Sequence, residues 1–305
     1  MANLFYTILD KRGLVAVSGQ DARPFLQSII SQDIDRVGPM NAAYGALLTP
    51  QGRFLHDFLI IEHDGIFLLD CEAARAGDLA ARLRSYKLRS RVELSVDTDR
   101  YEVIALWGEC PAAALDLPEE LGAARAFANG IAFVDPRIAE LGVRAILPRG
   151  QDASAISGAR FVSADFAAYD AHRLYLAIPD GSRDMIPEKS LLLEGNLDLL
   201  NGVSWEKGCY IGQELTARTY YRRLVKRRLT PVVIEGPPPL PGTPVIVGGD
   251  EVGKMSSSLG GRGLAIIQLS AQELSDESTM TAGEARLTRV SAPWGEPPER
   301  RPRPA

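Results

Sequence analysis

The sequence predicts an α+β fold with antiparallel sheets, followed by a small β-barrel. Short apolar runs of strand character are mixed with helical patterns, without the regular alternation of a doubly wound fold. After Arg228 the composition changes to proline, glycine and serine with short β-type runs. A chain of 305 residues is too long for one small core. We therefore expect a core over residues 1–228, with parts 1–98 and 99–228, and a barrel over 229–292.

The first part of the core begins with a strand, a turn and a helix. Leu14–Val17 is a short apolar run, and Gly19-Gln20-Asp21 supplies capping chemistry before a helix that carries Phe25 and Ile29 on one face. An antiparallel meander should follow. Its expected strands are Ala43–Leu48, Phe54–Ile61 and Ile66–Leu69, separated by Pro50-Gln51-Gly52 and His63-Asp64-Gly65.

Leu79, Leu83 and Tyr86 have helical spacing and lead to a strand at Val92–Val96, which ends the first part. From Tyr101 the pattern repeats in a second part. A strand at Tyr101–Leu106, an alanine-rich helix, and strands near Ile131–Val134 and Val143–Leu147 are expected next. The second part should therefore resemble the first in its elements.

The last part of the chain has the signals of a small barrel. Residues 235–242 read as a stiff proline-rich loop, and Val245–Val247 and Leu264–Leu269 are short β-type runs between glycines and serines. Residues 293–305 are rich in proline, arginine and glutamate, and we predict a disordered tail there.

Charge, cysteines and hydropathy limit the classes of partner and of site. The net charge of -5 disfavours nucleic acid and anionic lipid, except at a local basic patch. No signal-like or membrane-length apolar run is visible, so we expect a cytoplasmic protein. Cys71, Cys110 and Cys209 are far apart and odd in number, which predicts reduced thiols and no stably bound metal.

Residues 203–218, VSWEKGCYIGQELTAR, carry the strongest functional signal. Gly208 and Gly212 permit positive φ or a close approach of the backbone, and Gln213 and Glu214 are placed to open a helix toward Arg218. A thiol at Cys209, beside Lys207 and near a helix N-terminus, would have a lowered pKa and high reactivity. The alternative is that Cys209 is a small buried apolar residue, which is the interpretation we favour for Cys71 and Cys110.

The run KGCYIGQE with Ala217-Arg218 resembles the signature of the YgfZ family, relatives of the glycine-cleavage T-protein that include mitochondrial iron–sulfur assembly factors. Further similarity covers most of residues 9–229. It is carried by the segments Val17–Ala22, Phe25–Gln27, Gly52-Arg53 with Asp57, Tyr86–Ser90 and Ile186–Glu188 ahead of Asn196.

The resemblance implies a T-protein-like, folate-binding core of two mixed α and antiparallel-β parts around a central channel, with a C-terminal β-barrel. It implies tetrahydrofolate, or another folate, as cofactor. The family positions that match, as cofactor-binding residues, are Lys207, Gly208, Gly212, Gln213, Glu214 and Arg218, beside the reactive thiol of Cys209. Asp57 matches one of the paired acids of T-proteins and is the second residue that we assign to the chemistry.

The function that the resemblance implies is an accessory factor for assembly or repair of iron–sulfur clusters, rather than an ordinary enzyme. Its partners would be cluster assembly proteins or client cluster enzymes, including those that modify tRNA. The alternative is a folate-dependent aminomethyl transferase. His56 and Tyr175 replace acids of the T-protein pattern, so recognition of the pterin would have to be rebuilt, with stacking on Tyr169 or Tyr175.

Two basic patches permit a third interpretation. One contains six positive charges within residues 218–228, with Tyr220 and Tyr221 among them, and the other lies within residues 82–91. They would bind an anion, such as the glutamate tail of a folate or the phosphates of RNA, or form a solvated face. A non-catalytic protein that docks through these patches is the third hypothesis.

Overall fold

The computed structural model describes residues 3–150, 154–272 and 280–295. The chain divides into two compact units, which it enters alternately. The first unit comprises Met1–Leu47, His56–Tyr169 and Leu200–Ile211, and the second comprises Leu48–Leu55, Asp170–Leu199 and Gly212–Ala305. Because each unit is assembled from distant stretches of sequence, each functional segment must be placed by tertiary contacts.

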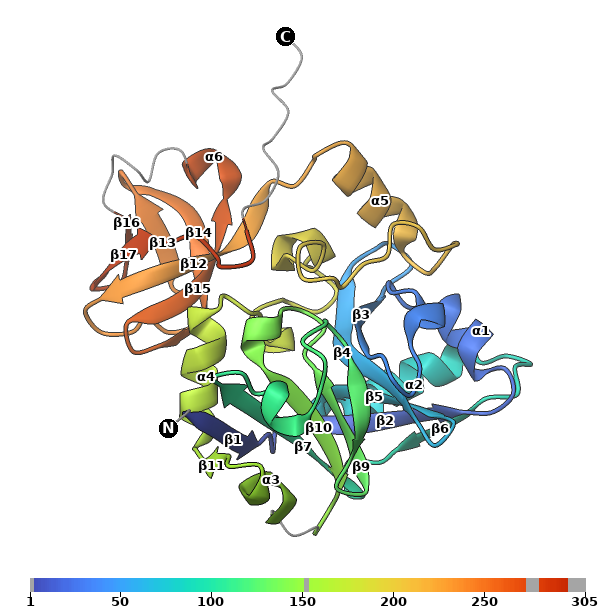
Figure 1. The fold of residues 1–305 in the computed structure, drawn as a ribbon. Helices are drawn as coiled ribbons and strands as arrows, with labels where there is room; N and C mark the ends of the chain where they lie inside the picture. The colour runs from blue at the N-terminus through green and yellow to red at the C-terminus, as the bar shows by residue number, and fades with distance from the viewer. Residues whose placement is uncertain (1–2, 151–153, 273–279, 296–305) are drawn as a thin grey trace. The chain divides into compact units, whose positions relative to one another are not determined.

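A six-stranded sheet forms one half of the first unit (Figure 1). Its strand order is β11-β1-β7-β10-β9-β8, with β1 and β11 parallel and the other neighbours antiparallel. One face is a core built around Leu106, Ala132 and Ala145. The strands are β1 (Leu4–Ile8), β7 (Tyr101–Gly108), β8 (Ala124–Phe127), β9 (Gly130–Val134), β10 (Val143–Pro148) and β11 (Val162–Ser163).

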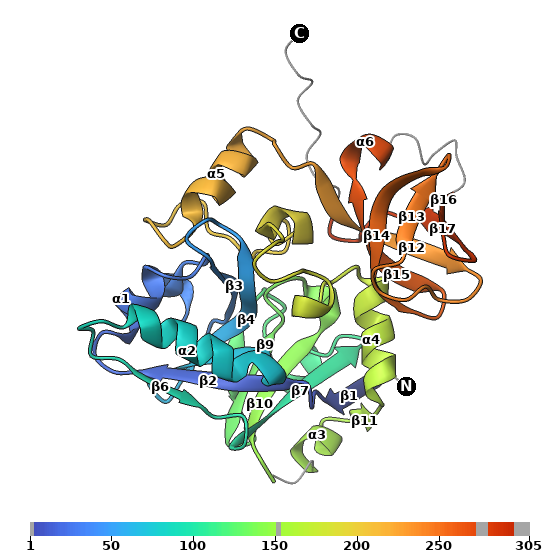
Figure 2. The ribbon, with the colours of Figure 1, turned by 180° about the vertical axis from the view of Figure 1, so that it is seen from behind.

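A five-stranded sheet has the order β3-β4-β5-β2-β6. Its strands are β2 (Arg12–Ser18), β3 (Ala43–Leu48), β4 (Phe54–His63), β5 (Ile66–Glu72) and β6 (Glu93–Val96). Helix α2 (Ala76–Tyr86) lies across β2 and β6 (Figure 2) and buries Leu79 and Leu83 at the predicted helical spacing. The expected meander and the helix after it are both confirmed.

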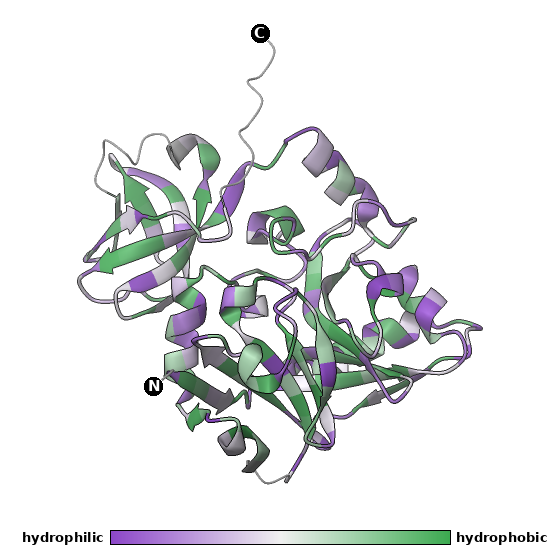
Figure 3. Cartoon of the chain, viewed as in Figure 1, coloured by the Kyte–Doolittle hydropathy of each residue, from purple (hydrophilic) through white to green (hydrophobic). Residues whose placement is uncertain are grey.

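The second unit contains a closed six-stranded barrel of order β12-β15-β14-β13-β16-β17. Its strands are β12 (Arg227–Glu235), β13 (Pro244–Val247), β14 (Asp250–Leu259), β15 (Arg262–Gln268), β16 (Met280–Ala282) and β17 (Ala285–Arg289). Val232, Val245 and Ala265 are fully buried in its core. The middles of β12 and β15 are buried and their outer ends are more exposed, and Figure 3 shows hydrophobic residues along the barrel strands. The predicted fold class is therefore confirmed.

The remaining helices are short. They are α1 (Ala22–Gln27), α3 (Ser154–Gly158), α4 (Phe166–Tyr175), α5 (Gln213–Tyr221) and α6 (Leu269–Gln272). Single 3-10 turns occur at η1 (Ile34–Arg36), η2 (Ala73–Arg75), η3 (Ala113–Leu115), η4 (Ala139–Leu141), η5 (Gly181–Arg183) and η6 (Leu192–Gly195). In the described part of the chain, no helix is long and apolar enough to cross a bilayer.

The predicted alanine-rich helix after Tyr101–Leu106 is wrong. That stretch holds only the turn η3, and it then enters β8 at Ala124. Asp116 takes a left-handed φ of 50 directly after the turn, and Leu115 and Leu117 are buried, so packing on the sheet outweighs the helix propensity of alanine. Most of the tail predicted at 293–305 lies outside the described residues.

Candidate functional site

A cavity of about 430 Å³ opens in the first unit. Tyr44 and Ala43 of β3 line it, together with the irregular segment that contains Val203, Ser204 and Trp205. Its remaining lining residues are Gln32, Arg36, Asn41, Ala42, Leu121, Pro136, Asn201 and Glu206. The volume is that of a typical small-molecule site, and two aromatic rings beside amide and hydroxyl groups suit a flat polar ligand.

Hydrogen bonds from distant parts of the chain hold the segment before Trp205 at this cavity. The Ser31 hydroxyl donates to the Gly202 carbonyl at 2.6 Å and accepts from the Ala46 amide at 2.8 Å. The Gln32 side-chain amide donates to the Asn201 carbonyl at 2.6 Å. An irregular segment needs such partners because it has no ladder or helix to satisfy its backbone.

Lys207 anchors the loop that follows. Its ammonium is buried and donates to the carbonyls of Ile30 at 2.9 Å and Gln32 at 2.8 Å. Burial lowers the pKa of this amine to about 8. It also lies 5.3 Å from the centre of the buried Tyr210 ring. Lys207 therefore fixes the loop, whereas the sequence predicts a cofactor contact and an activating charge beside Cys209.

Gly208 and Cys209 are exposed between the buried residues Lys207 and Tyr210. A Cβ at Gly208 would meet nothing within 4 Å, and Gly208 does not have a positive φ. The fold itself thus imposes no demand for glycine at this position. The buried alternative for Cys209 does not describe the structure, because the thiol is presented to solvent by an anchored loop.

Gly212 is constrained, unlike Gly208. Its φ is +80, and a Cβ there would lie 2.6 Å from the carbonyl oxygen of Thr49 and 3.0 Å from the Cα of Gly52. The two glycine turns therefore pack backbone against backbone at the start of α5. Gln213 and Glu214 open α5 as predicted, and Glu214 forms an ion pair with Arg218 on the exposed face.

Asp57 lies behind the cavity wall. It is buried on β4, and the hydroxyl of Tyr44 donates to its Oδ2 at 2.9 Å. No donor among the described residues contacts its Oδ1. Burial is the main cause that raises the pKa of Asp57 to about 6, with Arg12 acting against it. Burial and the charge of Asp57 hold the pKa of Tyr44 well above its usual value.

An arginine–carboxylate network surrounds this pair. Arg12 contacts Asp70 at 2.6 Å, and Arg144 lies 3.7 Å from both Asp70 and Asp135. Arg137 binds Asp135 at 2.7 Å, and its guanidinium lies 5.4 Å from the centre of the Tyr44 ring.

Our sequence reasoning missed this network and the cavity residues Tyr44 and Trp205. The available signal was a charged residue inside an apolar strand, as at Asp70 in β5 and Arg144 in β10.

The two predicted stacking tyrosines have different surroundings. Tyr169 is buried in the first unit, its ring 5.4 Å from that of Trp107 and its hydroxyl 3.1 Å from a guanidinium nitrogen of Arg144. Tyr175 belongs to the second unit, is 62% exposed, and lies 5.2 Å from the guanidinium of Arg262. Neither tyrosine is among the residues that line the cavity beside Tyr44.

His56 and part of the basic segment have structural partners. His56 is buried against Asp78 at 2.9 Å, and burial, reinforced by Arg75, lowers its pKa to about 4. Arg228 is buried and pairs with Asp198 at 2.8 Å, and Arg227 pairs with Glu194 at 2.7 Å. The exposed basic residues of this segment are Arg218, Arg222, Arg223, Lys226 and Arg227. In the described part of the chain, no group of three or more metal-ligating side chains is assembled.

Comparisons with known proteins place the chain in a family. The GCVT N-terminal domain matches residues 9–141, and the C-terminal beta-barrel domain of CAF17 matches residues 226–296. The chain is 35% identical to the human iron–sulfur cluster assembly factor IBA57, mitochondrial, over 85% of its own length and 76% of that protein. It is 32% identical to the mouse protein of the same name, over 93% and 82%.

A solved structure shows the same fold. The glycine cleavage system aminomethyltransferase T from Bartonella henselae superposes with a TM-score of 0.79 at 19% identity, covering 96% of this chain and 86% of that one. At this identity the likeness concerns the fold alone.

Two sequence-based expectations need correction. The cytoplasmic location is contradicted, because the human, mouse and Neurospora crassa relatives are mitochondrial proteins. Composition and apolar runs describe solubility, and they do not encode the compartment. The resemblance to the YgfZ family holds at the level of a related family, and the matching relatives refine it. The chain belongs to the IBA57 family, with its GCVT-type core and CAF17-type barrel.

Proposed function

We propose that this protein is an iron–sulfur cluster assembly factor that binds a tetrahydrofolate in the cavity of its first unit. The relatives that share 76% and 82% of their length with it are named as cluster assembly factors. The single observation that carries the ligand is Asp57, a buried acid with one oxygen that no described donor contacts, directly behind the cavity wall formed by Tyr44.

The residues present fit a reduced pterin. Trp205 offers an aromatic face to a flat ring, and the buried Tyr44 forms part of the wall behind it. The acceptor Oδ1 of Asp57, on the far side of Tyr44, would suit an N–H group of a heterocycle that reaches past this wall. Tetrahydrofolate, when bound, would supply a carrier for one-carbon units. Asp57 would position it and hold or release a proton at Oδ1, because a pKa of about 6 lies near physiological pH.

Cys209 would contact the cluster that is being transferred. Its thiol is exposed on a loop that Lys207 and Tyr210 anchor, so it can approach a cluster held by another protein without rearrangement of the core. A thiolate is the natural protein ligand of such clusters. The partners would be other assembly proteins or client cluster enzymes, among them those that modify tRNA.

Calorimetric titration with tetrahydrofolate tests the ligand. Saturable binding by the wild type should weaken at least tenfold in Asp57→Ala, because a charge-assisted hydrogen bond is worth about 1.5–3 kcal/mol. Tyr44→Phe should give a smaller loss, since it keeps the ring and removes only the hydroxyl. Asp10→Ala, a change at an exposed carboxylate, is the matched control. Equal binding by the wild type and Asp57→Ala would refute this site.

The role of Cys209 requires a second experiment. In a strain that lacks the endogenous factor, Cys209→Ser should fail to restore cluster-enzyme activity, whereas Cys110→Ser, at another exposed cysteine, should restore it. Full restoration by Cys209→Ser would remove the thiol from the proposal while leaving the folate site to its own test.

A folate-dependent aminomethyl transferase is the second candidate function, and the raised pKa of Asp57 favours it. Against it, His56 is buried against Asp78 with a pKa of about 4, so at neutral pH it is an uncharged group and cannot replace an acid. Release of formaldehyde or formation of methylene-tetrahydrofolate from an aminomethyl donor, dependent on Asp57, would support this candidate. A turnover indistinguishable from buffer would exclude it.

A further inference from the structure

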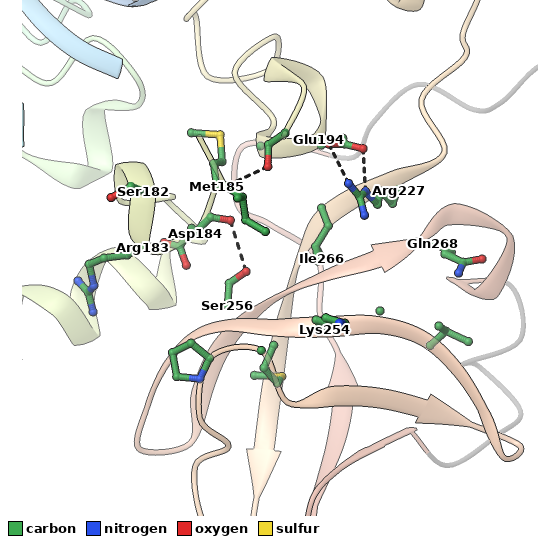
Figure 4. Close-up of a pocket in the computed structure, with 18 of the residues that line it drawn as sticks. Ser182, Arg183, Asp184, Met185, Glu194, Arg227, Lys254, Ser256, Ile266 and Gln268 are labelled. Carbon is green, nitrogen blue, oxygen red and sulfur yellow. Dashed lines mark hydrogen bonds and ion pairs between the residues drawn. The ribbon is translucent and has the colours of Figure 1, made fainter. Parts of the chain in front are cut away.

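Two adjoining cavities of the second unit share part of their walls. One has a volume of about 300 Å³ and the other about 630 Å³, and Glu194, Arg227 and Gln268 line both. Figure 4 shows the Glu194 carboxylate and the Arg227 guanidinium directed at each other from η6 and β12. The Glu194–Arg227 pair therefore lies along the border that the two compartments share.

The wall of the smaller compartment is mostly apolar, and charged residues that line it are held in ion pairs. Met185, Ile186 and Met255 belong to its wall. Arg183 is held by Asp170 at 2.8 Å and by Asp180 at 2.7 Å, and Figure 4 shows it directed away from the cavity. Ile186 is 59% exposed, so this wall presents apolar surface that a ligand in the cavity would cover.

The larger compartment carries an excess of positive charge. The basic residues that line it are Arg53, Lys226 and Arg227, and the acidic residue that lines it is Glu194. The Glu194 carboxylate is already satisfied, since Arg227 contacts Oε1 at 2.7 Å and the Leu191 amide donates to Oε2 at 2.9 Å. Three basic groups against one acid leave a surplus for an anion, and the hydroxyls of Thr219 and Ser270 add possible donors.

We propose that these two compartments form a binding site for a small amphiphilic anion, with its apolar body against Ile186 and Met255 and its anionic group at Lys226 and Arg53. The ligand class is an apolar molecule that carries a carboxylate, sulfonate or phosphate. Such a ligand would cover Ile186 and neutralise the surplus charge at once. This site lies wholly in the second unit and does not depend on the folate proposal.

Fluorescence titration with anilinonaphthalene sulfonate, an aromatic body with one sulfonate, tests the site on the full-length folded protein. The wild type should bind the probe saturably. Lys226→Gln should weaken binding about fivefold, because one ionic contact is lost. Ile186→Ser should weaken it about threefold through lost apolar contact. Both residues are exposed, so neither change should affect folding, and a urea unfolding curve checks each variant.

Matched controls separate this site from general adsorption. Arg286→Gln removes an exposed positive charge that lines neither compartment, and Leu88→Ser removes a 90% exposed apolar side chain of the first unit. Both should leave the affinity unchanged, as should Asp57→Asn, which alters the proposed folate site alone. An uncharged relative of the probe, phenylnaphthylamine, should respond to Ile186→Ser and ignore Lys226→Gln.

The opposite results would overturn the proposal. Probe binding that does not saturate, or that is unaffected by both Lys226→Gln and Ile186→Ser, contradicts a built site. Equal losses in Arg286→Gln and Lys226→Gln would reduce the effect to net charge.

Discussion

Asp57 has a chemistry that its buried surroundings determine. Its carboxyl accepts the Tyr44 hydroxyl, and the guanidinium of Arg137 lies over the Tyr44 ring. Burial nevertheless dominates the electrostatics, because the pKa of Asp57 rises to about 6. At neutral pH the Asp57 carboxyl is therefore ionised even though its burial favours the protonated form.

The pH dependence of stability follows from this shift. The pKa of Asp57 in the folded protein lies above the ordinary value of an aspartate, so the contribution of Asp57 to stability is complete at low pH and is lost as pH rises through the folded pKa. Asp57→Asn, which removes the charge, should therefore raise the free energy of unfolding by about 2 kcal/mol near pH 8 and change it little near pH 4. Urea unfolding at both pH values measures the difference. A variant that is less stable than wild type near pH 8 would show that the carboxylate stabilises the fold.

The three thiols differ in burial, and their reactivity should follow. Cys209 and Cys110 are exposed, while Cys71 is buried in β5 and burial raises its pKa to about 12. Because the thiolate is the reactive form, iodoacetamide should modify Cys110 and Cys209 in the native protein and Cys71 only after denaturation. Mass spectrometry of the intact protein and of its peptides follows each site. Early modification of Cys71 would mean that β5 opens under native conditions.

At the scale of elements, the loop from Lys207 to Gly212 combines two kinds of glycine. Gly212 has a left-handed φ of +80 and no room for a Cβ, whereas a Cβ at Gly208 would meet nothing within 4 Å. Gly212 serves the start of α5. Gly208 is open beside the exposed thiol of Cys209, where a ligand or partner would approach.

Alanine substitutions should separate these roles. Gly212→Ala should lower the free energy of unfolding by about 2 kcal/mol or more through strain and the contact with the Thr49 carbonyl. Gly208→Ala should leave stability within about 0.5 kcal/mol. Thermal and urea unfolding give both values. If Gly208→Ala keeps stability but loses cluster-assembly activity, the glycine serves recognition; equal destabilisation by both changes would contradict the geometry.

At the scale of the whole molecule, the first barrel strand also stabilises residues that lie outside the barrel. Arg228 of β12 pairs with the buried Asp198 at 2.8 Å and donates to the Asn196 side chain at 3.0 Å. These acidic and amide groups precede the barrel by about thirty residues in sequence, and both belong to the second unit. The segment around η6 is therefore completed by the first barrel strand.

A chain truncated after residue 225 should consequently fail to fold cooperatively. It would leave Asp198, whose side chain is 1% exposed, without Arg228. In the full chain, Asp198→Asn should lower the free energy of unfolding by about 3 kcal/mol, since one partner of a buried ion pair is lost. Circular dichroism and unfolding curves report both effects. A soluble fragment of residues 1–225 with a cooperative transition would refute this dependence.

The sequence by itself determined the fold class, the meander, the barrel and the helix that begins after Gly212. These features depend on local patterns, such as the apolar run along β4 or a glycine before Gln213, which short-range sterics and burial fix. The motif around Cys209 also indicated the broader family correctly, because a run of specific residues is read directly from the chain.

Only the tertiary structure decided what the residues of the site do. It turned Lys207 into an anchor by placing it against Ile30, 177 residues earlier in the chain. It places the Tyr44 hydroxyl in hydrogen-bond contact with Asp57, and it places Arg144 of one sheet 3.7 Å from Asp70 of another. The physical reason is that burial and long-range pairing set the charge and hydrogen bonding of a side chain, and neither is encoded in its neighbours along the sequence.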